Sequence, residues 1–446
     1  MSETTSEQLP ALTVIGTGYL GAVHAACMAN FGYDVLGVDV DEDKIAALTA
    51  GDAPFYEPGL DEALSQAMAS GRLRFTTDFA EAAEFGDVHF LCVGTPQQAG
   101  SNAADVSHVN AAAESLAVHM RRPALVVGKS TVPVGTAARL KTLFHKLAPA
   151  GDQIDVAWNP EFLREGFAVA DTNHPDRLVV GVDNDASNDL LRLVYRNQIN
   201  NGVPYLRTDL ATAELVKVAA NSFLATKISF INAMAEVCDK AGADVTQLAN
   251  AIGYDERIGS KFLRAGLGFG GGCLPKDIRA FMARAGELGV DDALLFLREI
   301  DDINLRQRRR TIEIATKFVG GDASGVAIAA LGAAFKPDSD DVRDSPALDV
   351  AAKLHLQGAD VRIYDPKAMD NAAKVFPTLT YASSAEDACR GADLVLLLTE
   401  WSEFAHLDPV ALRDTVATPR ILDGRNALDA DKWRAAGWTY HGLGRP

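Results

Sequence analysis

The chain has 446 residues, with 42 Lys or Arg against 60 Asp or Glu, which gives a formal net charge of −18 at pH 7. This acidic balance excludes general nucleic-acid binding, because polyanions are attracted by basic surfaces, although a few converging cations could still hold an anionic small molecule. The length suggests about three domains. A hydrophobic content of 48% is ordinary for a globular protein.

The first ten residues, MSETTSEQLP, lack the charged and apolar regions of a secretory leader. No apolar run approaches the roughly 18 residues of a membrane span, and LVLLL at 394–398 suits a buried strand. The five cysteines are odd in number and never in CxxC spacing, so we expect neither a disulfide framework nor a metal site. We therefore expect a cytoplasmic protein without a membrane or nucleic-acid partner.

The first half of the chain alternates strand-like apolar runs with helical patterns. The runs are LTVIG (12–16), DVLGVDV (34–40), VHFLCVG (88–94) and ALVVGKS (124–130). Such alternation predicts an α/β domain with a doubly wound parallel sheet.

The first of these runs leads into GTGYLG, in which Gly16, Gly18 and Gly21 fit G-x-G-x-x-G. Here the motif follows a predicted strand and opens a helix, and Asp39 ends the next strand. The glycines would let the backbone meet a pyrophosphate at the helix N-terminus, and Asp39 would bond the ribose hydroxyls. An acid repels a 2′-phosphate, so we expect NAD and not NADP, with Lys44 near the adenosine. The alternative is a glycine turn that binds no nucleotide.

NPEFLREG (159–166) places Glu161, Arg164 and Glu165 after a predicted strand. Each residue alone is unremarkable, but two acids beside an aromatic side chain suit proton transfer.

The stretch 209–240 contains no Gly or Pro and is rich in Ala and Leu, which predicts one long helix that ends before Gly242. About 30 residues would make a helix about 45 Å long. A helix of that length exceeds the needs of one domain, so we expect it to bridge domains and to pair with a second copy of the chain. Lys217 and Asn221 share one of its faces. They are either part of a solvated stripe or a polar pair that points into a site.

LGFGGGCLPKD (267–277) places Cys273 directly after three glycines. Pro275 suits the first turn of a helix that runs to about Leu288. The dipole at that N-terminus would favour a thiolate, and Asp277 lies one turn on. The glycines would let a substrate approach closely. The alternative to a nucleophile is a buried structural thiol.

Strand–helix alternation returns after Gly320, with strands in 325–332, 359–366, 392–400 and 420–426. No glycine fingerprint accompanies this half. Its loops carry Lys336, Arg343 and Arg425, which are either solvated or part of a second nucleotide or diphosphate site. We expect two Rossmann-like domains joined by a long helix and a helical dimerisation region, with boundaries at 1–207, 208–320 and 321–446.

These blocks, together with FYEPGL, STVPVGT, HPDRLVVG, ERIGSKFL, FKPDSDDVRDSP and DGRN, make the whole chain resemble the nucleotide-sugar dehydrogenases of the UDP-glucose/GDP-mannose dehydrogenase family. The resemblance implies four-electron oxidation of UDP-glucose at C6 to the carboxylate with two NAD. GDP-mannose or a UDP-N-acetylhexosamine is the alternative substrate. A non-catalytic nucleotide-sugar-binding regulator is the alternative from another class, which a retained Cys273 argues against.

The resemblance also implies roles for individual residues. Cys273 would be the nucleophile that carries a thiohemiacetal and then a thioester, and Lys217 and Asn221 would stabilise the oxyanion. Water activation and proton transfer would fall to Thr131, Glu161 and Asp277. The residues implied for NAD are Gly16, Gly18, Tyr19, Leu20, Gly21, Asp39, Lys44, Thr95, Thr131, Glu165, Lys276 and Arg343. Those implied for the nucleotide sugar are Glu161, Phe162, Leu163, Arg164, Glu165, Lys217, Asn221, Arg257, Phe262, Leu263, Arg264, Gly266, Gly270, Lys336 and Arg425, of which Arg257 would reach a neighbouring subunit's substrate.

The sequence departs from the family pattern at two positions beside the cysteine. Gly272 stands where a serine is common, and Leu274 stands where an aromatic residue is common. Neither change removes a mechanistic group.

Overall fold

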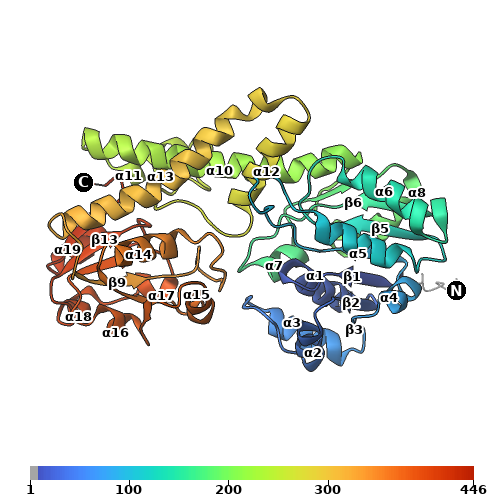
Figure 1. The fold of residues 1–446 in the computed structure, drawn as a ribbon, viewed down its shortest axis with the longest axis horizontal. Coiled ribbons are helices and arrows are strands. Elements are labelled where there is room, and N and C mark those ends of the chain that lie inside the picture. Colours follow the sequence, from blue (N-terminus) through green and yellow to red (C-terminus); the bar gives the residue numbers. More distant parts are fainter. Residues whose placement is uncertain (1–8, 446) are drawn as a thin grey trace. The chain divides into compact units, whose positions relative to one another are not determined.

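A computed structural model of the chain describes residues 9–445. The chain forms two compact units, residues 1–220 and 221–446, and each contains one sheet (Figure 1). The expectation that the chain starts without a leader concerns residues that lie mostly outside the described part. Within residues 9–445, no helix combines the length and the apolar character that crossing a bilayer requires.

The first unit is built on an eight-stranded sheet in the order β3-β2-β1-β4-β5-β6-β7-β8. All neighbouring strands run parallel except β6 and β7, which pair antiparallel at Trp158 and Gly181. This confirms the predicted doubly wound parallel sheet and adds an antiparallel junction that the sequence pattern did not indicate. The strands are β1 (Leu12–Ile15), β2 (Val35–Val38), β3 (Leu73–Thr76), β4 (Val88–Leu91), β5 (Ala124–Gly128), β6 (Ile154–Trp158), β7 (Leu178–Gly181) and β8 (Tyr205–Thr208).

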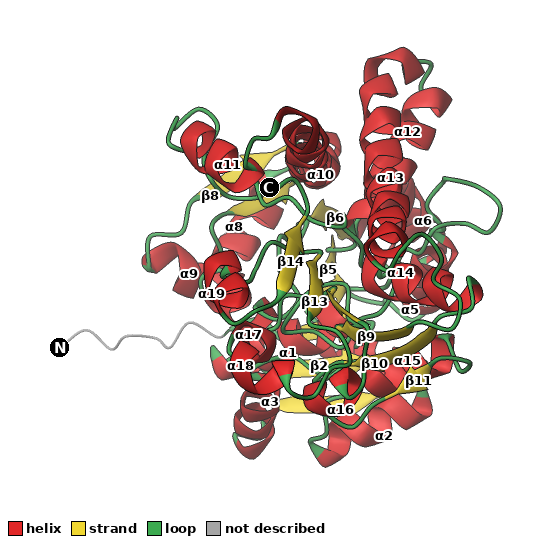
Figure 2. Ribbon diagram, turned by 90° about the vertical axis from the view of Figure 1, so that its left-hand side faces the viewer, coloured by secondary structure: helices red, strands yellow, loops and turns green. Residues whose placement is uncertain are grey.

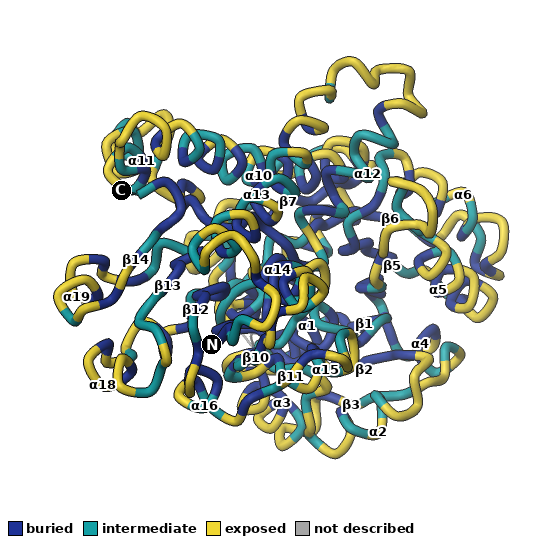
Figure 3. Tube along the Cα trace, turned by 60° about the vertical axis from the view of Figure 1, so that its left-hand side comes forward, coloured by how far each residue is buried: buried dark blue, intermediate teal, exposed yellow. Residues whose placement is uncertain are grey.

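Helices flank this sheet, and the central strands β1, β2, β4 and β7 are buried along their whole length (Figures 2 and 3). Strands covered on both faces read as continuous apolar runs, which is why the sequence located them. The helices are α1 (Tyr19–Asn30), α2 (Glu42–Ala50), α3 (Leu60–Ala69), α4 (Phe79–Phe85), α5 (Ser107–Ala117), α6 (Thr136–Leu147), η1 (Gly151–Gln153), α7 (Ala168–Asn173), α8 (Asp185–Val194) and α9 (Arg196–Asn200).

The long helix α10 spans Leu210–Ala241, which confirms the predicted helix over 209–240 (Figure 1). It ends where Gly242 adopts a left-handed conformation with φ 72°, a backbone state that glycine enters without steric cost. After it, the second unit contains α11 (Val245–Gly253), α12 (Leu274–Glu287), η2 (Asp291–Leu294) and α13 (Leu295–Phe318).

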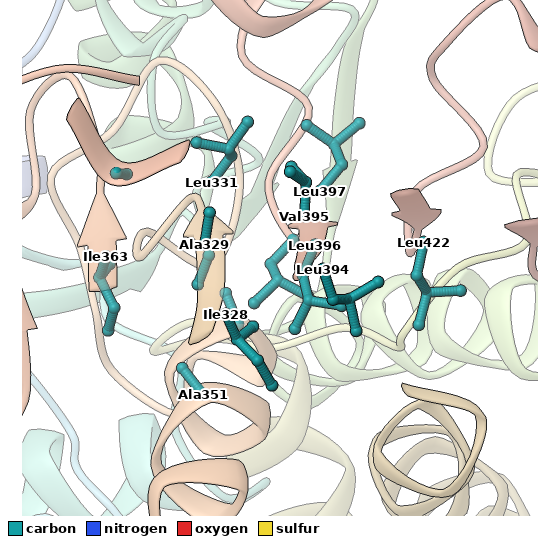
Figure 4. Close-up of a cluster of buried hydrophobic side chains, with 14 of the residues drawn as sticks. Ile328, Ala329, Leu331, Ala351, Ile363, Leu394, Val395, Leu396, Leu397 and Leu422 are labelled. Carbon is teal, nitrogen blue, oxygen red and sulfur yellow. The ribbon is translucent and has the colours of Figure 1, made fainter. Parts of the chain in front are cut away.

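The second sheet has six parallel strands in the order β11-β10-β9-β12-β13-β14, the same relative order as the first six strands of the other sheet. Its core joins Ile328 and Leu331 of β9 to Leu394–Leu397 of β12 and Leu422 of β13 (Figure 4). The strands are β9 (Ala327–Leu331), β10 (Asp360–Tyr364), β11 (Thr380–Tyr381), β12 (Leu394–Leu397), β13 (Arg420–Asp423) and β14 (Thr439–Gly442). The helices are α14 (Pro346–Leu356), α15 (Met369–Val375), α16 (Ala385–Cys389), α17 (Ser402–Ala405), α18 (Pro409–Arg413) and α19 (Ala430–Ala435).

Candidate functional site

The first turn of the first sheet has the shape that a dinucleotide needs. Gly16 has φ 89°, and a Cβ on Gly21 would lie 1.8 Å from the carbonyl oxygen of Gly16, so both positions require glycine. Gly18 directly precedes α1, and a Cβ there would meet nothing within 4 Å. The first turn of α1 carries no acidic side chain. The open space and the uncapped helix N-terminus therefore fit a pyrophosphate group.

Asp39 follows β2 and stands beside this turn. Its Oδ2 accepts hydrogen bonds from the Thr17 backbone N–H at 2.8 Å and from Lys44 Nζ at 2.9 Å, and its Oδ1 accepts from the Asp41 N–H at 3.2 Å. Burial alone would raise the pKa of Asp39, but these donors outweigh it and hold the pKa below its ordinary value. The carboxylate is thus ionised at neutral pH and fits ribose hydroxyls. Lys44 lies against Asp39 and forms an ion pair with it at 2.9 Å.

Lys217 on α10 is the centre of a second group of predicted residues in the first unit. It is buried, and its Nζ lies 3.0 Å from Glu161 Oε1. Glu161 also accepts the Leu163 N–H at 2.5 Å, which folds the 159–166 loop back on itself. Two cations lie near the ring of Phe162, with Lys217 Nζ 5.7 Å and the Arg177 guanidinium 4.0 Å from its centroid. Glu161, Phe162 and Lys217 are thus neighbours in the structure, together with Arg177.

The remaining predicted residues of this unit have simpler surroundings. Thr95 is buried and donates its hydroxyl to the Thr131 carbonyl at 2.7 Å, so two expected site residues are adjacent. The Tyr19 hydroxyl accepts the Gly166 N–H at 2.7 Å, which ties the glycine turn to the end of the 159–166 loop. Arg164 is exposed and pairs with Asp171. Leu20 and Glu165 are half-buried.

Two buried glutamates that the sequence reasoning did not single out explain the FYEPGL and STVPVGT motifs. Glu57 accepts the Gly166 and Ala168 N–H groups at 2.6 Å each, at the start of α7. Glu214 on α10 accepts the Gly135 and Ala137 N–H groups at 2.7 Å each, at the start of α6. Both carboxylates cap helix N-termini from a distance in sequence. No local spacing rule could have revealed these pairs.

In the second unit, Cys273 is exposed and directly precedes α12, in which Pro275 occupies the first turn. The predicted helix start is thus confirmed to within one residue. Asp277, one turn on, is buried and accepts the Asn221 side-chain N–H at 2.6 Å. Lys276 Nζ lies 2.5 Å from the other oxygen of Asp277. Asn221, Lys276 and Asp277 therefore form one polar group at the helix start that bears Cys273.

The glycines before Cys273 make room for the protein's own atoms. A Cβ on Gly270 would lie 2.3 Å from the Asp344 carbonyl oxygen, one on Gly271 2.7 Å from the Phe335 ring, and one on Gly272 2.4 Å from the Arg343 guanidinium. The expectation that these glycines leave space for a substrate was wrong for their Cβ positions, because the segment 335–346 fills that space. At position 272 the neighbour is the end of the flexible Arg343 side chain, which is 63% exposed and could move aside, so the structure does not explain the glycine there.

The cysteine loop is also held by its backbone. Asn304 on α13 accepts the Phe269 N–H at 2.7 Å and donates to the Phe269 carbonyl at 3.0 Å. Arg308 donates to the same carbonyl at 3.2 Å. Arg425 donates to the carbonyls of Gly268 at 3.0 Å, Leu398 at 2.7 Å and Phe335 at 3.1 Å. Arg425 thus joins three loops.

The other residues predicted for the nucleotide sugar are spread over the second unit. Leu263, Gly266 and Gly270 are buried, Lys336 is half-buried, and Phe262, with φ 65°, and Arg264 are exposed. Arg343 is exposed and pairs with Asp341. Arg257 is 88% exposed and pairs only with Asp255 among the described residues, so nothing within the chain explains why it should be part of a site. Within residues 9–445, no cluster of His, Cys, Asp or Glu side chains suits a metal ion.

Comparison with known proteins identifies the family. Three sequence profiles of the UDP-glucose/GDP-mannose dehydrogenase family match in order: the NAD binding domain at residues 11–199, the central domain at 211–306 and the UDP binding domain at 329–430. A UDP-glucose 6-dehydrogenase from Rhizobium meliloti (strain 1021) is 44% identical over 437 residues, which cover 98% of this chain and 99% of the relative.

Solved structures give the same result. A UDP-glucose dehydrogenase from the hyperthermophilic archaeon Pyrobaculum islandicum superposes with a TM-score of 0.91 at 36% identity and 99% coverage of both chains. A UDP-D-ManNAc dehydrogenase from Pyrococcus horikoshii superposes with a TM-score of 0.85 at 27% identity, covering 98% of this chain and 99% of its own. The chain is an NAD-dependent oxidoreductase and belongs to the UDP-glucose/GDP-mannose dehydrogenase family.

Proposed function

We propose that this chain oxidises UDP-glucose at C6 to UDP-glucuronate and releases two NADH per sugar. The observation that carries the proposal is the exposed Cys273 at the start of α12, with the Asn221–Asp277 pair one turn away. The 44% identical relative is named a UDP-glucose 6-dehydrogenase, and the UDP binding domain profile covers 329–430. An isolated structural thiol would require neither exposure nor this polar group.

The role of Cys273 follows from the chemistry of the aldehyde. Removal of a hydride and a proton from the C6 alcohol gives an aldehyde that would otherwise hydrate or escape. The Cys273 thiolate adds to the aldehyde carbon, and the oxygen takes up a proton to give a thiohemiacetal. Loss of a second hydride and the hydroxyl proton gives a thioester. Water then attacks the thioester carbon, and the C–S bond breaks to give the carboxylate and Cys273 thiol.

The surrounding side chains would stabilise charge and move protons in these steps. Lys217 and Asn221, four residues apart on α10, would face the developing oxyanion at C6. Asp277 and Glu161 would take protons from water, and the Thr131 hydroxyl would position the water.

NAD, when bound, supplies the hydride acceptor for both oxidations. The chain would hold it with the open Gly18 position and the α1 N-terminus at the pyrophosphate and with Asp39 at the ribose. The other residues in this proposal are Gly16, Tyr19, Leu20, Gly21, Lys44, Thr95, Thr131, Glu165, Lys276 and Arg343.

The sugar nucleotide would be bound by cations and backbone of the second unit. Arg425 and Lys336 supply positive charge for the diphosphate. The other proposed contacts are Glu161, Phe162, Leu163, Arg164, Glu165, Lys217, Asn221, Arg257, Phe262, Leu263, Arg264, Gly266 and Gly270. We propose three domains with boundaries at 1–207, 208–320 and 321–446, close to the three profile matches.

The substrate and the mechanism are tested by NADH stoichiometry. Purified enzyme is assayed with UDP-glucose, UDP-N-acetylhexosamines and GDP-mannose, and we expect two NADH per UDP-glucose. Cys273→Ala should abolish the second oxidation, and Cys273→Ser should lower kcat by orders of magnitude and accumulate an ester visible by mass spectrometry. Cys238→Ala, which removes a buried thiol on α10, is the control. Near wild-type formation of UDP-glucuronate by Cys273→Ala would show that Cys273 is structural. Faster turnover of another sugar nucleotide would assign that substrate.

We also propose that the chain forms a homodimer through α10. Phe223, Phe230 and Val237 are 66%, 46% and 57% exposed on this helix, and their seven-residue spacing places them on one face. A second copy of the chain would cover this apolar stripe, and Arg257 would then reach the neighbouring subunit's substrate. Light scattering should give twice the chain mass, and Phe223→Glu with Phe230→Glu should give the monomer. A wild-type monomer at micromolar concentration contradicts the proposal.

We propose the cytoplasm as the place where the enzyme works. NAD serves as an oxidant there, and the five cysteines form no disulfide in the structure. Fluorescence microscopy of a tagged chain tests this.

A further inference from the structure

Lys129 is a buried cation that the mechanism above does not use. It follows β5 directly and precedes the Ser130–Thr131 turn, and its side chain is almost fully enclosed. Among the described residues, no carboxylate lies within ion-pair distance of it. Its ammonium group instead donates to Asn159 Oδ1 at 2.8 Å and lies 3.4 Å from the Tyr195 hydroxyl. A buried charge without a direct counter-ion is costly, so its retention calls for a role.

Asn159 connects this cation to the 159–166 loop. Its Oδ1 also accepts the Tyr195 hydroxyl at 2.5 Å, its side-chain N–H donates to the Val179 carbonyl of β7 at 2.8 Å, and its backbone N–H donates to the Gly128 carbonyl at 2.8 Å. Asn159 is therefore fixed to β5 and β7 at the antiparallel junction between β6 and β7. Two residues later, Glu161 forms its ion pair with Lys217.

Three titratable groups around Lys129, namely His24, Cys92 and Tyr195, are uncharged near pH 8. Burial and the Lys129 charge lower the pKa of His24 on α1 far below its ordinary value. Burial raises the pKa of Cys92, after β4, to about 12 and raises the pKa of Tyr195, between α8 and α9, well above its ordinary value. The Phe90 ring lies 5.9 Å from Lys129 Nζ. Glu161 is thus the charged group that attracts the ammonium, although it is paired with Lys217.

We propose that Lys129 is a positioning residue for this reaction: its protonated amine locks Asn159 and so fixes where the 159–166 loop presents Glu161 to Lys217. This role rests on the proposed function, in which Glu161 and Lys217 act at C6. Burial lowers the pKa of Lys129 to about 8, so the ammonium group would lose its proton within a pH range that the enzyme assay can reach. The neutral amine would remain a donor of weaker bonds, and the base of the loop would loosen.

The test compares Lys129→Met, which keeps the apolar stem without the charge, with Lys141→Met. Lys141 is a lysine of the same unit that pairs with Asp155 and Asp183 outside the network. Hydrogen exchange measured by mass spectrometry should be at least tenfold faster in 159–166 for Lys129→Met and unchanged for Lys141→Met. Tyr195→Phe, which removes one donor to Asn159 and keeps the charge, should fall between them.

Kinetics give a second readout. Lys129→Met should lower kcat about 100-fold, because small displacements of a positioning group cost that much, with the KM for NAD changed less than threefold. Wild-type kcat should fall above about pH 8, and this alkaline limb should be absent in Lys129→Met and present in Lys141→Met.

A merely structural lysine would give a different set of results. Lys129→Met would then lower the midpoint of thermal unfolding while hydrogen exchange in 159–166, kcat and the alkaline limb stayed as in the wild type, and this outcome would overturn the proposal. Hydrogen exchange requires no turnover. If the wild type failed to oxidise any sugar nucleotide, the proposed function would fall while the exchange comparison still decided whether Lys129 orders the loop.

Discussion

The turn after the first strand of each sheet is held by an aspartate, but the two aspartates differ in how many donors they accept. In each sheet an aspartate after the second strand accepts N–H groups from the turn after the first strand. Asp39 accepts the Thr17 N–H, and Asp365 accepts the Ala333 and Ala334 N–H groups at 2.8 and 3.0 Å. Asp365 also accepts the Lys367 and Ala368 N–H groups and the Trp401 indole N–H. Asp39 has one oxygen with a single long hydrogen bond, whereas Asp365 has five donors and is 1% exposed.

The difference shows how one topology separates two ligand classes. The Asp39 turn has an open Gly18 position and an acid with remaining acceptor capacity, which suits a ribose and a pyrophosphate. The carboxylate of Asp365 is occupied by four backbone N–H groups and the Trp401 indole N–H, which leaves it less acceptor capacity for a ligand than Asp39 has. Strand order alone therefore does not predict a dinucleotide site.

The largest expected effect is on stability, from Asp365→Ala. The substitution leaves five donors without an acceptor, four of them in buried hydrogen bonds, and we expect the free energy of unfolding to fall by about 4 kcal/mol. Urea denaturation measures it through fluorescence, because Trp401, Trp433 and Trp438 lie in the second unit. Asp360→Ala, at an exposed position on β10, is the control and should change stability by less than about 0.5 kcal/mol. The affinity for NAD should not change in Asp365→Ala. A tenfold weaker affinity would show that the Asp365 turn contributes to NAD binding, against the comparison made above.

The second effect is the acid sensitivity of the first unit. Burial holds the pKa of His89 at about 3 and that of His24 well below its ordinary value, so the folded state excludes the imidazolium forms. The contribution of His89 to the free energy of unfolding is complete above the unfolded pKa of about 6.5 and is lost as pH falls toward the folded pKa of about 3, by about 2 kcal/mol between pH 6.5 and 5, and His24 acts in the same direction. His89→Asn should reduce the loss between these two pH values by about that amount in urea titrations. An unchanged loss in the variant would contradict the assignment.

The third effect separates packing from ligand space within the glycine turn. Gly21→Ala should lower the free energy of unfolding by about 2 kcal/mol, because its Cβ would collide with the Gly16 carbonyl. Gly18→Ala should change stability by less than about 0.5 kcal/mol and weaken NAD binding about tenfold, because its methyl group enters the open space. Calorimetric titration with NAD and thermal unfolding distinguish the two. Equal behaviour of both variants would mean that the space at Gly18 receives no ligand.

The smallest effect is that of Asp39→Ala, the counterpart of Asp365→Ala. Asp39 is 8% exposed, but two of its donors, the Asp41 N–H and Lys44 Nζ, are only partly buried, so we expect the free energy of unfolding to fall by about 1 kcal/mol. The KM for NAD should rise about tenfold, and the preference of kcat/KM for NAD over NADP should narrow, because Lys44 becomes available to a 2′-phosphate. Steady-state kinetics with both cofactors measure this. If the wild-type enzyme had the same kcat/KM with NADP as with NAD, Asp39 would not be the residue that selects NAD.

The sequence predicted the long helix and the apolar strands β1, β2, β4, β5, β9, β10, β12 and β13, because these elements depend on helix propensity and on apolar runs within the element itself. It did not predict short, partly exposed strands such as β3 and β8, which have no continuous apolar run. It located Gly16, Asp39, Cys273 and Lys217 because local motifs or the family resemblance mark them. The capping roles of Glu57 and Glu214 could not be predicted, because each residue caps a helix more than 70 residues away in sequence and no local pattern marks such a pair. The network of Lys129, Asn159 and Tyr195 could not be predicted for the same reason, because its members are far apart in sequence.

The glycines before Cys273 were recognised as a motif, but the reason predicted for them, space for a substrate, was wrong. Glycine indicates close approach but does not say of what. Only the structure shows that segment 335–346, more than 60 residues later, occupies those Cβ positions. Likewise, the sequence pattern did not indicate that β6 and β7 pair antiparallel, because this direction depends on the path of the loop between them.

The backbone partners of the cysteine loop have a consequence for the order in which the chain folds during synthesis. Phe269 is held by Asn304, 35 residues later, and Gly268 by Arg425, 157 residues later. Contacts of such separation form late, because the intervening chain must close first. During synthesis from the N-terminus, the loop cannot adopt its final conformation until β13 has left the ribosome. A truncated chain that ends before Arg425 would therefore carry Cys273 on an unformed loop, and the conformation of this loop is completed only when the last sheet has formed.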